Sequence, residues 1–284
     1  MKQAFIKYLL ALLLFGTNGI VASRISLSSY EIVYLRTFIG SLFLIAMFLL
    51  SGHKITFYHH KKDFIFLILS GMAMGGSWMF LYEAYTQIGV SIASLAYYCG
   101  PIIVMILSPL LFKEKLTSGK ILGFICVLAG LFLVNGRVLK STDSPWGFIC
   151  GIASALMYAL MVIFNKKASS VKGLENSTVQ LTVSFLTVAL FVGMKQGFLI
   201  QIPSGSLLPI IFLGLVNTGI GCYLYFSSLS RIPVQTISVC GYLEPLSAVC
   251  FSAIFLKEQL SLLQFIGAIL ILGGQFLSKK NFFQ

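Results

Sequence analysis

Two stretches of the chain repeat one pattern at a distance of 144 residues: SVCGYLEPLSAVCFSAIFLKEQLS at Ser238–Ser261 and SLAYYCGPIIVMILSPLLFKEKLT at Ser94–Thr117. The match extends without a gap and pairs Val90–Leu133 with Val234–Leu277. Its identities include a serine, a tyrosine, a proline and a Lys-Glu pair, which chance matching of apolar residues does not explain. The pattern therefore indicates that one structural unit is present twice.

The composition indicates that the chain is surrounded by lipid. Of its 284 residues, 58% are hydrophobic and 10% are charged, whereas soluble domains carry roughly 25% charged residues. A helix of about 20 apolar residues crosses a bilayer core. Ten such spans are predicted, at residues 4–23, 30–51, 64–86, 91–112, 120–137, 145–166, 176–194, 207–229, 235–256 and 262–279. The sequence thus predicts an all-α integral membrane protein with ten transmembrane helices and no soluble domain.

The repeat divides these helices into two halves. Helices three to five correspond to eight to ten, and helices one and two correspond by position to six and seven. Two five-helix repeats are expected, at residues 1–138 and 145–281, joined by LKSTDSP. Because five is an odd number, the second repeat enters the membrane from the opposite face. Such inverted repeats provide secondary transporters with two states, open inward and open outward, around a site near the midplane.

Lys and Arg residues are divided unevenly between the two sides. With the N-terminus inside, 14 lie on the inner side and five on the outer side, and Arg36 lies within a span. Because cytoplasmic loops carry such an excess, both termini are expected in the cytoplasm and the protein in the plasma or inner membrane. The loop at Lys140 is expected outside, and the loops at Lys115 and Lys257 on opposite faces. Alternatively, the first 23 residues are a signal peptide, whose removal would leave nine helices.

Six short motifs occur in order along the two halves: Phe15-Gly16-Thr17-Asn18, Arg36, Gly100-Pro101, Lys113-Glu114-Lys115-Leu116, Tyr242-Leu243-Glu244-Pro245 and Lys257-Glu258-Gln259-Leu260. Together they resemble the EamA-type ten-helix transporters of the drug/metabolite transporter superfamily. The resemblance covers both halves. It implies a carrier of amino acids, amines, other metabolites or drugs, commonly an exporter driven by protons or another gradient. Phe15 departs from the commoner Trp-Gly start of helix one.

Arg36, Glu83 and Glu244 are the charged residues expected at membrane depth, away from the ends of the predicted spans. Such groups are costly in lipid and usually face a cavity or a partner. Arg36 and Glu83 both lie near the outer surface, which favours an ion pair between helices two and three; the alternative is a substrate or proton role for Glu83. Glu244 lies near the midplane, and its counterpart in the first half is Gly100. The repeated scaffold therefore does not require this acid, which points to a function such as proton coupling; a helix-to-helix hydrogen bond by the neutral acid is the equal alternative.

Aromatic and amide side chains at the depth of a central cavity are the candidates for substrate binding: Asn18, Trp78, Tyr82, Tyr98, Tyr158, Asn217 and Tyr242. Aromatic rings can stack on a substrate or surround an amine by cation–π attraction, although Trp and Tyr near helix ends otherwise belong to interfacial belts. Pro101 and Pro245 occupy matched mid-span positions, where a proline removes a backbone hydrogen bond. We predict that both are hinges; packing distortion is the alternative.

The sequence lacks the motifs of several other classes of protein. It contains no GxxxxGK[ST] loop for ATP, no histidine within a span and no CxxC pair, so we expect no catalytic residue, metal or cofactor. We expect a secondary transporter, not an enzyme, that exports amino acids or amines by alternating access with protons as the coupling ion. Its partners are the bilayer and a small-molecule substrate, and not nucleic acid. The alternatives are uptake of a cationic amine into an aromatic pocket, and a receptor or scaffold without transport.

Overall fold

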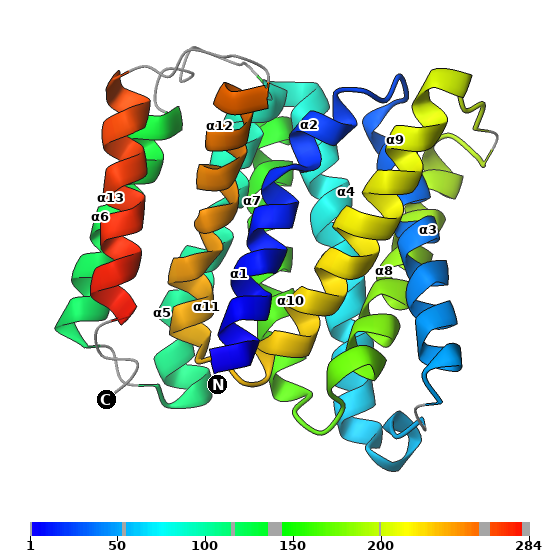
Figure 1. Ribbon diagram of the computed structural model, residues 1–284, viewed down its shortest axis with the longest axis horizontal. Coiled ribbons are helices and arrows are strands. Elements are labelled where there is room, and N and C mark those ends of the chain that lie inside the picture. Colours follow the sequence, from blue (N-terminus) through cyan, green and yellow to red (C-terminus); the bar gives the residue numbers. More distant parts are fainter. Residues whose placement is uncertain are drawn as a thin grey trace.

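The computed structural model describes residues 2–52, 55–114, 117–135, 144–198, 200–255 and 262–279. Over these ranges the chain is a bundle of helices without strands (Figure 1). Eight helical stretches are long and apolar enough to cross a membrane, and two further apolar helices, Ser118–Leu133 and Phe265–Gly274, are shorter. The protein is therefore an all-α multi-pass membrane protein, as predicted.

The helices of each half follow the predicted spans. The first half contains α1 (Lys2–Gly16), α2 (Asn18–Ala22), α3 (Ser29–Leu50), η1 (Phe57–His59), α4 (Lys61–Tyr97), α5 (Gly100–Phe112) and α6 (Ser118–Asn135). The second half contains α7 (Pro145–Lys167), α8 (Gly173–Lys195), η3 (Ser204–Ser206), α9 (Leu207–Phe212), the π-helix η4 (Leu213–Ile220), α10 (Gly221–Leu229), α11 (Val234–Gly241), α12 (Leu243–Phe255) and α13 (Leu262–Lys279). The third span is the part of α4 before Gly89, whose φ of 77° interrupts this helix. The fourth span consists of the rest of α4 and of α5.

The two halves are inverted repeats. A shift of 144 residues carries the bounds of α6 onto those of α13, and the bounds of α3 fall within one residue of those of α8. Matching helices run in opposite directions: α1 and α6 run upward in Figure 1, whereas α7 and α13 run downward. The start of α1 and the end of α13 consequently lie at the same, lower end of the bundle.

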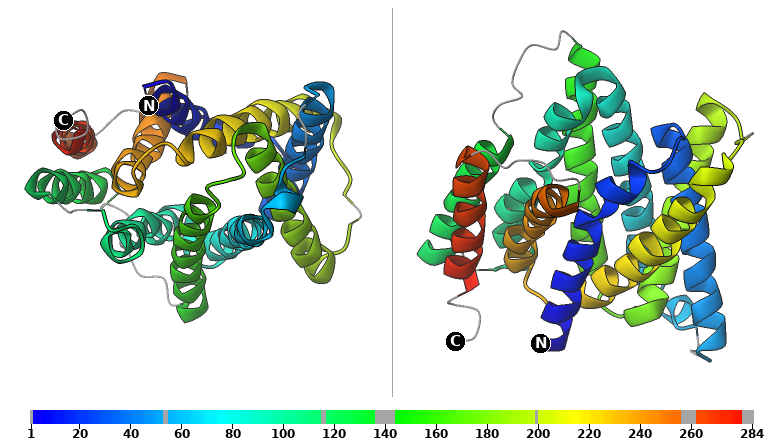
Figure 2. Two further views of the ribbon diagram at one scale, coloured as in Figure 1. Left: turned by 90° about the horizontal axis from the view of Figure 1, so that it is seen from below. Right: turned by 45° about the horizontal axis from the view of Figure 1, so that its top comes forward.

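Helices α6 and α13 form a pair at one edge of the bundle (Figure 2). Glycines that the repeat matches bring them together. A methyl group added to Gly130 of α6 would lie 2.5 Å from the carbonyl oxygen of Gly267, and one added to Gly274 of α13 would lie 2.4 Å from that of Gly123. Backbone approaches this close require residues without a side chain.

The fourth and ninth spans are each broken near the middle. One break lies at Tyr98 and Cys99, between α4 and α5, and the other at Tyr242, between α11 and α12. Pro101 is in the first turn of α5 and Pro245 is the third residue of α12, so each proline follows a break by two or three residues, as expected for a kink at a mid-span proline; the hinge role stays a prediction. A proline has no N–H for the carbonyl four residues earlier; these carbonyls belong to Tyr97 and Gly241, the last residues of α4 and α11. These spans are therefore interrupted before their prolines.

Candidate functional site

A cavity of about 520 Å³ lies between the two repeats. Its lining comes from α1 to α4 of the first half and from α7, α10 and α12 of the second. It reaches Ile25 and Leu27 in the turn between α2 and α3, at the upper end of Figure 1. None of the described connections at the lower end lines it. The cavity is thus accessible from the end opposite the start of α1.

Most of the predicted site residues lie on the wall of this cavity. The structure places seven of the ten side-chain candidates there: Asn18, Arg36, Trp78, Tyr82, Tyr98, Tyr158 and Glu244. Glu83, Asn217, Tyr242 and the two prolines are not among the lining residues. One helix of the first repeat and one of the second supply the two charged members of the set, so the site depends on both repeats.

Three tyrosines of the wall were not among the candidates: Tyr85, Tyr97 and Tyr225. Tyr85 continues the spacing of Trp78 and Tyr82 along α4, since residues at i, i+4 and i+7 share one helix face. That spacing could have identified Tyr85 from the sequence. Tyr97 and Tyr225 carry no comparable signal, because a tyrosine a few residues from the end of a span is equally typical of an interface.

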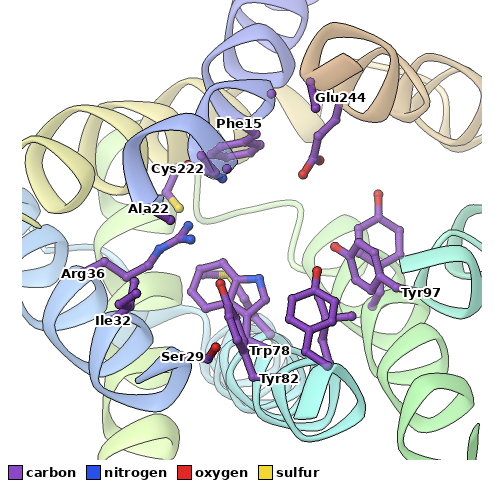
Figure 3. A pocket seen from close by; sticks show the side chains of 18 of the residues that line it. Phe15, Ala22, Ser29, Ile32, Arg36, Trp78, Tyr82, Tyr97, Cys222 and Glu244 are labelled. Carbon is purple, nitrogen blue, oxygen red and sulfur yellow. The ribbon is translucent and has the colours of Figure 1, made fainter. Parts of the chain in front are cut away.

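Arg36 projects into the cavity from α3 and is held on two sides (Figure 3). Its Nε donates a hydrogen bond to Thr218 Oγ1 at 3.0 Å, and its guanidinium carbon lies 4.9 Å from the centroid of the Trp78 ring. Only 6% of the residue is exposed. Among the described residues no acid forms an ion pair with it. The terminal nitrogens of the guanidinium are therefore available to a ligand carboxylate.

Glu244 enters the same cavity from α12, on another side of it (Figure 3). It lies in the first turn of α12, immediately after the break at Tyr242. In the part of the chain that the structure describes, its carboxylate has neither a hydrogen-bond partner nor an ion-pair partner. One acid and one base from different repeats thus face a common space.

Aromatic rings occupy the wall between these two charges. The rings of Tyr97 and Tyr158 meet edge to face with centroids 5.4 Å apart, and the hydroxyls of Tyr158 and Tyr225 lie 3.4 Å apart. Tyr82 packs edge-on against Tyr85 at 5.1 Å. Because these rings hold one another in place, they form a preassembled surface for an apolar part of a ligand.

Two predicted substrate-binding residues lie behind the wall. Tyr242 is fully buried, and its hydroxyl donates a hydrogen bond to the carbonyl of Tyr98 at 2.9 Å. It thereby joins the breaks of the fourth and ninth spans. Asn217 is also fully buried, and its side-chain nitrogen contacts oxygens of the first span. Counting residues predicted the depth of both side chains, but not the side of the helix on which each lies.

The predicted ion pair between Arg36 and Glu83 is wrong. Glu83 forms a salt bridge with Lys195 of α8 and accepts a hydrogen bond from the hydroxyl of Tyr30. Lys195 Nζ also donates to the Tyr30 hydroxyl at 3.0 Å. Arg36 lies six residues beyond Tyr30 on α3, where it faces the cavity instead. The Glu83 cluster ties α3, α4 and α8 together at the upper end of the bundle.

The lower end of the bundle is closed by contacts between the repeats. Glu114, which follows α5, accepts hydrogen bonds from the backbone N–H groups of Val234 and Gln235 at 2.7 and 3.0 Å. Tyr8 of α1 is fully buried, and its hydroxyl donates to the carbonyl of Ile237 at 2.8 Å. We call the contacts of Glu114 and Tyr8 with α11 the lower seal. They lie on the opposite side of the site from the cavity mouth.

Comparison with known proteins identifies the family. Residues 3–136 and residues 145–279 each match the EamA-like transporter family. The chain belongs to the EamA-like transporter family. The resemblance inferred from the motifs is thus confirmed, and the cavity between the repeats is the candidate substrate site of an EamA transporter.

Relatives of this EamA protein carry the names of transporters. Uncharacterized transporter YxxF of Bacillus subtilis (strain 168) is 25% identical over 280 residues, which cover 98% of this chain and 89% of that protein. An uncharacterized transporter of Archaeoglobus fulgidus is 25% identical over 265 residues, covering 93% and 92%. A crystal structure with 19% sequence identity superposes with a TM-score of 0.83 and covers 98% of both chains, which shows a shared fold.

Proposed function

We propose that this EamA transporter is a secondary carrier that exports amino acids or amines by alternating access. The observation that carries the proposal is the placement of Arg36 and Glu244 in one cavity with aromatic rings between them (Figure 3). An amino acid bears both a carboxylate and an ammonium group. A guanidinium binds a carboxylate through charge-assisted hydrogen bonds, and a carboxylate binds an ammonium in the same way. The site therefore offers a partner to each charge of a zwitterion.

The size and lining of the cavity support a small organic metabolite. Its volume of about 520 Å³ lies within the range of roughly 300–1,000 Å³ found for small-molecule sites. The tyrosines and Trp78 provide apolar surface, and their faces attract an ammonium group. Such a wall favours amino acids with large apolar side chains and arylalkyl amines.

The charge distribution supports an orientation with the lower end of Figure 1 in the cytoplasm, in the plasma or inner membrane. The described basic residues at that end are Lys2, Lys7, Lys61, Lys62, Lys113, Lys120, Lys166, Lys167, Lys172, Arg231 and Lys279, against Arg24 and Lys195 at the upper end. In this orientation the cavity opens outward. The loops at Lys115, Lys140 and Lys257, on which the topology prediction relied, lie outside the described residues.

Protons are the coupling ion in this proposal, and Glu244 carries them. Its carboxylate faces the cavity and has no partner among the described residues, so either a proton or a substrate ammonium can neutralise it. The two compete for the same group. On the more acidic side a proton displaces the substrate, and on the other side the substrate displaces the proton. This competition supports exchange of an inward-moving proton for an outward-moving substrate.

Three matched ligands test the substrate class: phenylalanine, phenethylamine, which lacks the carboxylate, and 3-phenylpropionate, which lacks the amine. A ligand that binds only the folded state raises the melting temperature, and one charge-assisted hydrogen bond contributes about 1.5–3 kcal/mol, roughly 10- to 100-fold in affinity. Phenylalanine should stabilise the purified protein most. Arg36→Gln should remove its advantage over phenethylamine, and Glu244→Gln its advantage over 3-phenylpropionate. Equal stabilisation of the unaltered protein by all three ligands would contradict the proposal.

Uptake of a cationic amine is the second candidate function, supported by the aromatic wall and by Glu244. It predicts that phenethylamine stabilises the protein at least as strongly as phenylalanine does. It also predicts that Arg36→Gln strengthens amine binding, because the substitution removes a positive charge from the cavity. Specific binding without solute movement in reconstituted vesicles would instead indicate a receptor or scaffold.

A further inference from the structure

The side-chain amide of Asn217 in η4 contacts three oxygen atoms at the junction of α1 and α2. Its Nδ2 lies 2.9 Å from the carbonyl oxygen of Leu14, 2.7 Å from Thr17 Oγ1 and 3.0 Å from Asn18 Oδ1. Thr17 stands between the two helices, where the first span is interrupted. Three oxygens of the first repeat therefore converge on one amide of the second repeat.

The oxygens at this junction outnumber the hydrogens available to them. An amide nitrogen carries two hydrogens, yet three oxygens surround it, and the hydroxyl hydrogen of Thr17 is already donated to Leu14 at 2.7 Å. Asn217 Oδ1 is buried and has no hydrogen-bond partner within the described part of the chain. A buried polar atom without a partner is unusual, and a bound water or ion is one explanation for it. Half a rotation of the amide would turn this oxygen toward the other three.

The surroundings favour a positive charge at this point. The junction lies at the C-terminal end of α1, which presents the negative end of the helix dipole. Arg36 donates instead to the neighbouring Thr218 and makes no hydrogen bond to these oxygens. Gly16 and Asn18 line the cavity, so an ion that enters the cavity reaches the junction without crossing the bundle.

We propose that the junction binds Na⁺, with Leu14 O, Thr17 Oγ1, Asn18 Oδ1 and Asn217 Oδ1 as its ligands. Carbonyl, hydroxyl and amide oxygens suit a hard cation, and interrupted membrane helices use such groups and their C-terminal ends to hold Na⁺. These neutral oxygens are not basic enough to hold a proton instead. Bound Na⁺ would link the first span to the eighth, and hence one repeat to the other. The site is independent of which solute the cavity carries.

Thermal unfolding of the purified protein tests the site without measuring transport. NaCl is titrated against choline chloride at constant ionic strength, with KCl as a second comparison. Na⁺ should raise the melting temperature to a plateau, K⁺ should do so more weakly, and choline should have no effect. Thr17→Val should weaken the Na⁺ response at least several-fold. Thr187→Val is the matched control, because Thr187 donates a similar local hydrogen bond, to the carbonyl of Val183, away from the junction.

Asn217→Asp separates an ion site from a purely structural amide. Aspartate keeps the oxygens, adds a negative charge and removes both hydrogens. A Na⁺ site predicts that this variant is unstable in choline chloride and recovers at a lower Na⁺ concentration than the unaltered protein requires. A structural amide predicts an unstable variant that Na⁺ does not rescue. That result, or equal melting temperatures of the unaltered protein in all three salts, would overturn the proposal. Asn217→Leu should abolish the response, and a full response would also overturn it.

Discussion

At the scale of single residues, a substitution of Glu244 distinguishes substrate binding from proton coupling. Glutamine keeps the shape of the protonated acid but cannot release a proton. If Glu244 carries the coupling proton, Glu244→Gln should preserve exchange of substrate across a vesicle membrane. Accumulation driven by a pH gradient should fall to background, because the variant cannot change its protonation state between the two sides. Uptake of radiolabelled substrate into vesicles, with and without an imposed pH gradient, measures both quantities.

Glu83→Gln is the matched control for this experiment. The change is the same, but Glu83 is held by Lys195 and Tyr30 rather than facing the cavity. It should lower the yield of folded protein, because it removes the salt bridge between α4 and α8, while the protein that does fold remains coupled. Normal, pH-dependent accumulation by Glu244→Gln would show that another group carries the proton.

The sequence predicts charged cavity residues better than neutral ones. Arg36 and Glu244 could be assigned to a cavity because a charge facing lipid is costly, and both line it. Tyr242 and Asn217 are neutral, and a hydrogen bond to a neighbouring helix satisfies them equally well. Counting residues gives depth along a helix but not direction around it. Lys195, which pairs with Glu83, lies at the end of a distant helix, so this contact depends on tertiary packing.

At the scale of helices, α6 and α13 offer a test of close packing with a control one residue away. A methyl group at Gly274 would lie 2.4 Å from the Gly123 carbonyl, whereas one at Gly273 would meet nothing within 4 Å. Gly274→Ala should therefore force the helices apart and destabilise the protein by about 1–3 kcal/mol. Gly273→Ala should be neutral or slightly stabilising, because alanine favours a helix over glycine. Heating in detergent followed by size-exclusion chromatography compares the two. Equal losses would exclude this contact as the cause.

The repeat predicts both the helices and the places where two of the spans bend. The bounds of α13 follow from those of α6, because a duplicated unit retains its pattern of apolar residues and glycines. The matched prolines predict a kink in each of these spans, and the breaks at Tyr98 and Tyr242 lie just before Pro101 and Pro245. The hydrogen bond between these two residues joins positions 144 apart, and only the folded chain brings them together. The π-helix η4 likewise has no pattern of its own in the sequence.

At the scale of the whole molecule, the two ends of the bundle differ. The upper end gives access to the cavity, and the lower end is closed by the lower seal. Two inverted repeats can exchange these arrangements, so that the lower end opens when the upper end closes. The seal therefore stabilises the state that is open at the upper end selectively, and a weaker seal should shift the population toward the other state.

Glu114→Gln tests this shift. Glutamine retains one oxygen for α11 but loses the charge and the second acceptor, which should weaken the seal by about 1–2 kcal/mol. Ala248 lines the cavity, so Ala248→Cys in a background without native cysteines reports access from outside intact cells to an impermeant thiol reagent. Labelling should slow several-fold when Glu114→Gln is added. Glu31→Gln is the control, because Glu31 caps its own helix at the upper end. Unchanged labelling in the Glu114→Gln protein, or equal slowing in both, would show that Glu114 does not hold the lower end closed.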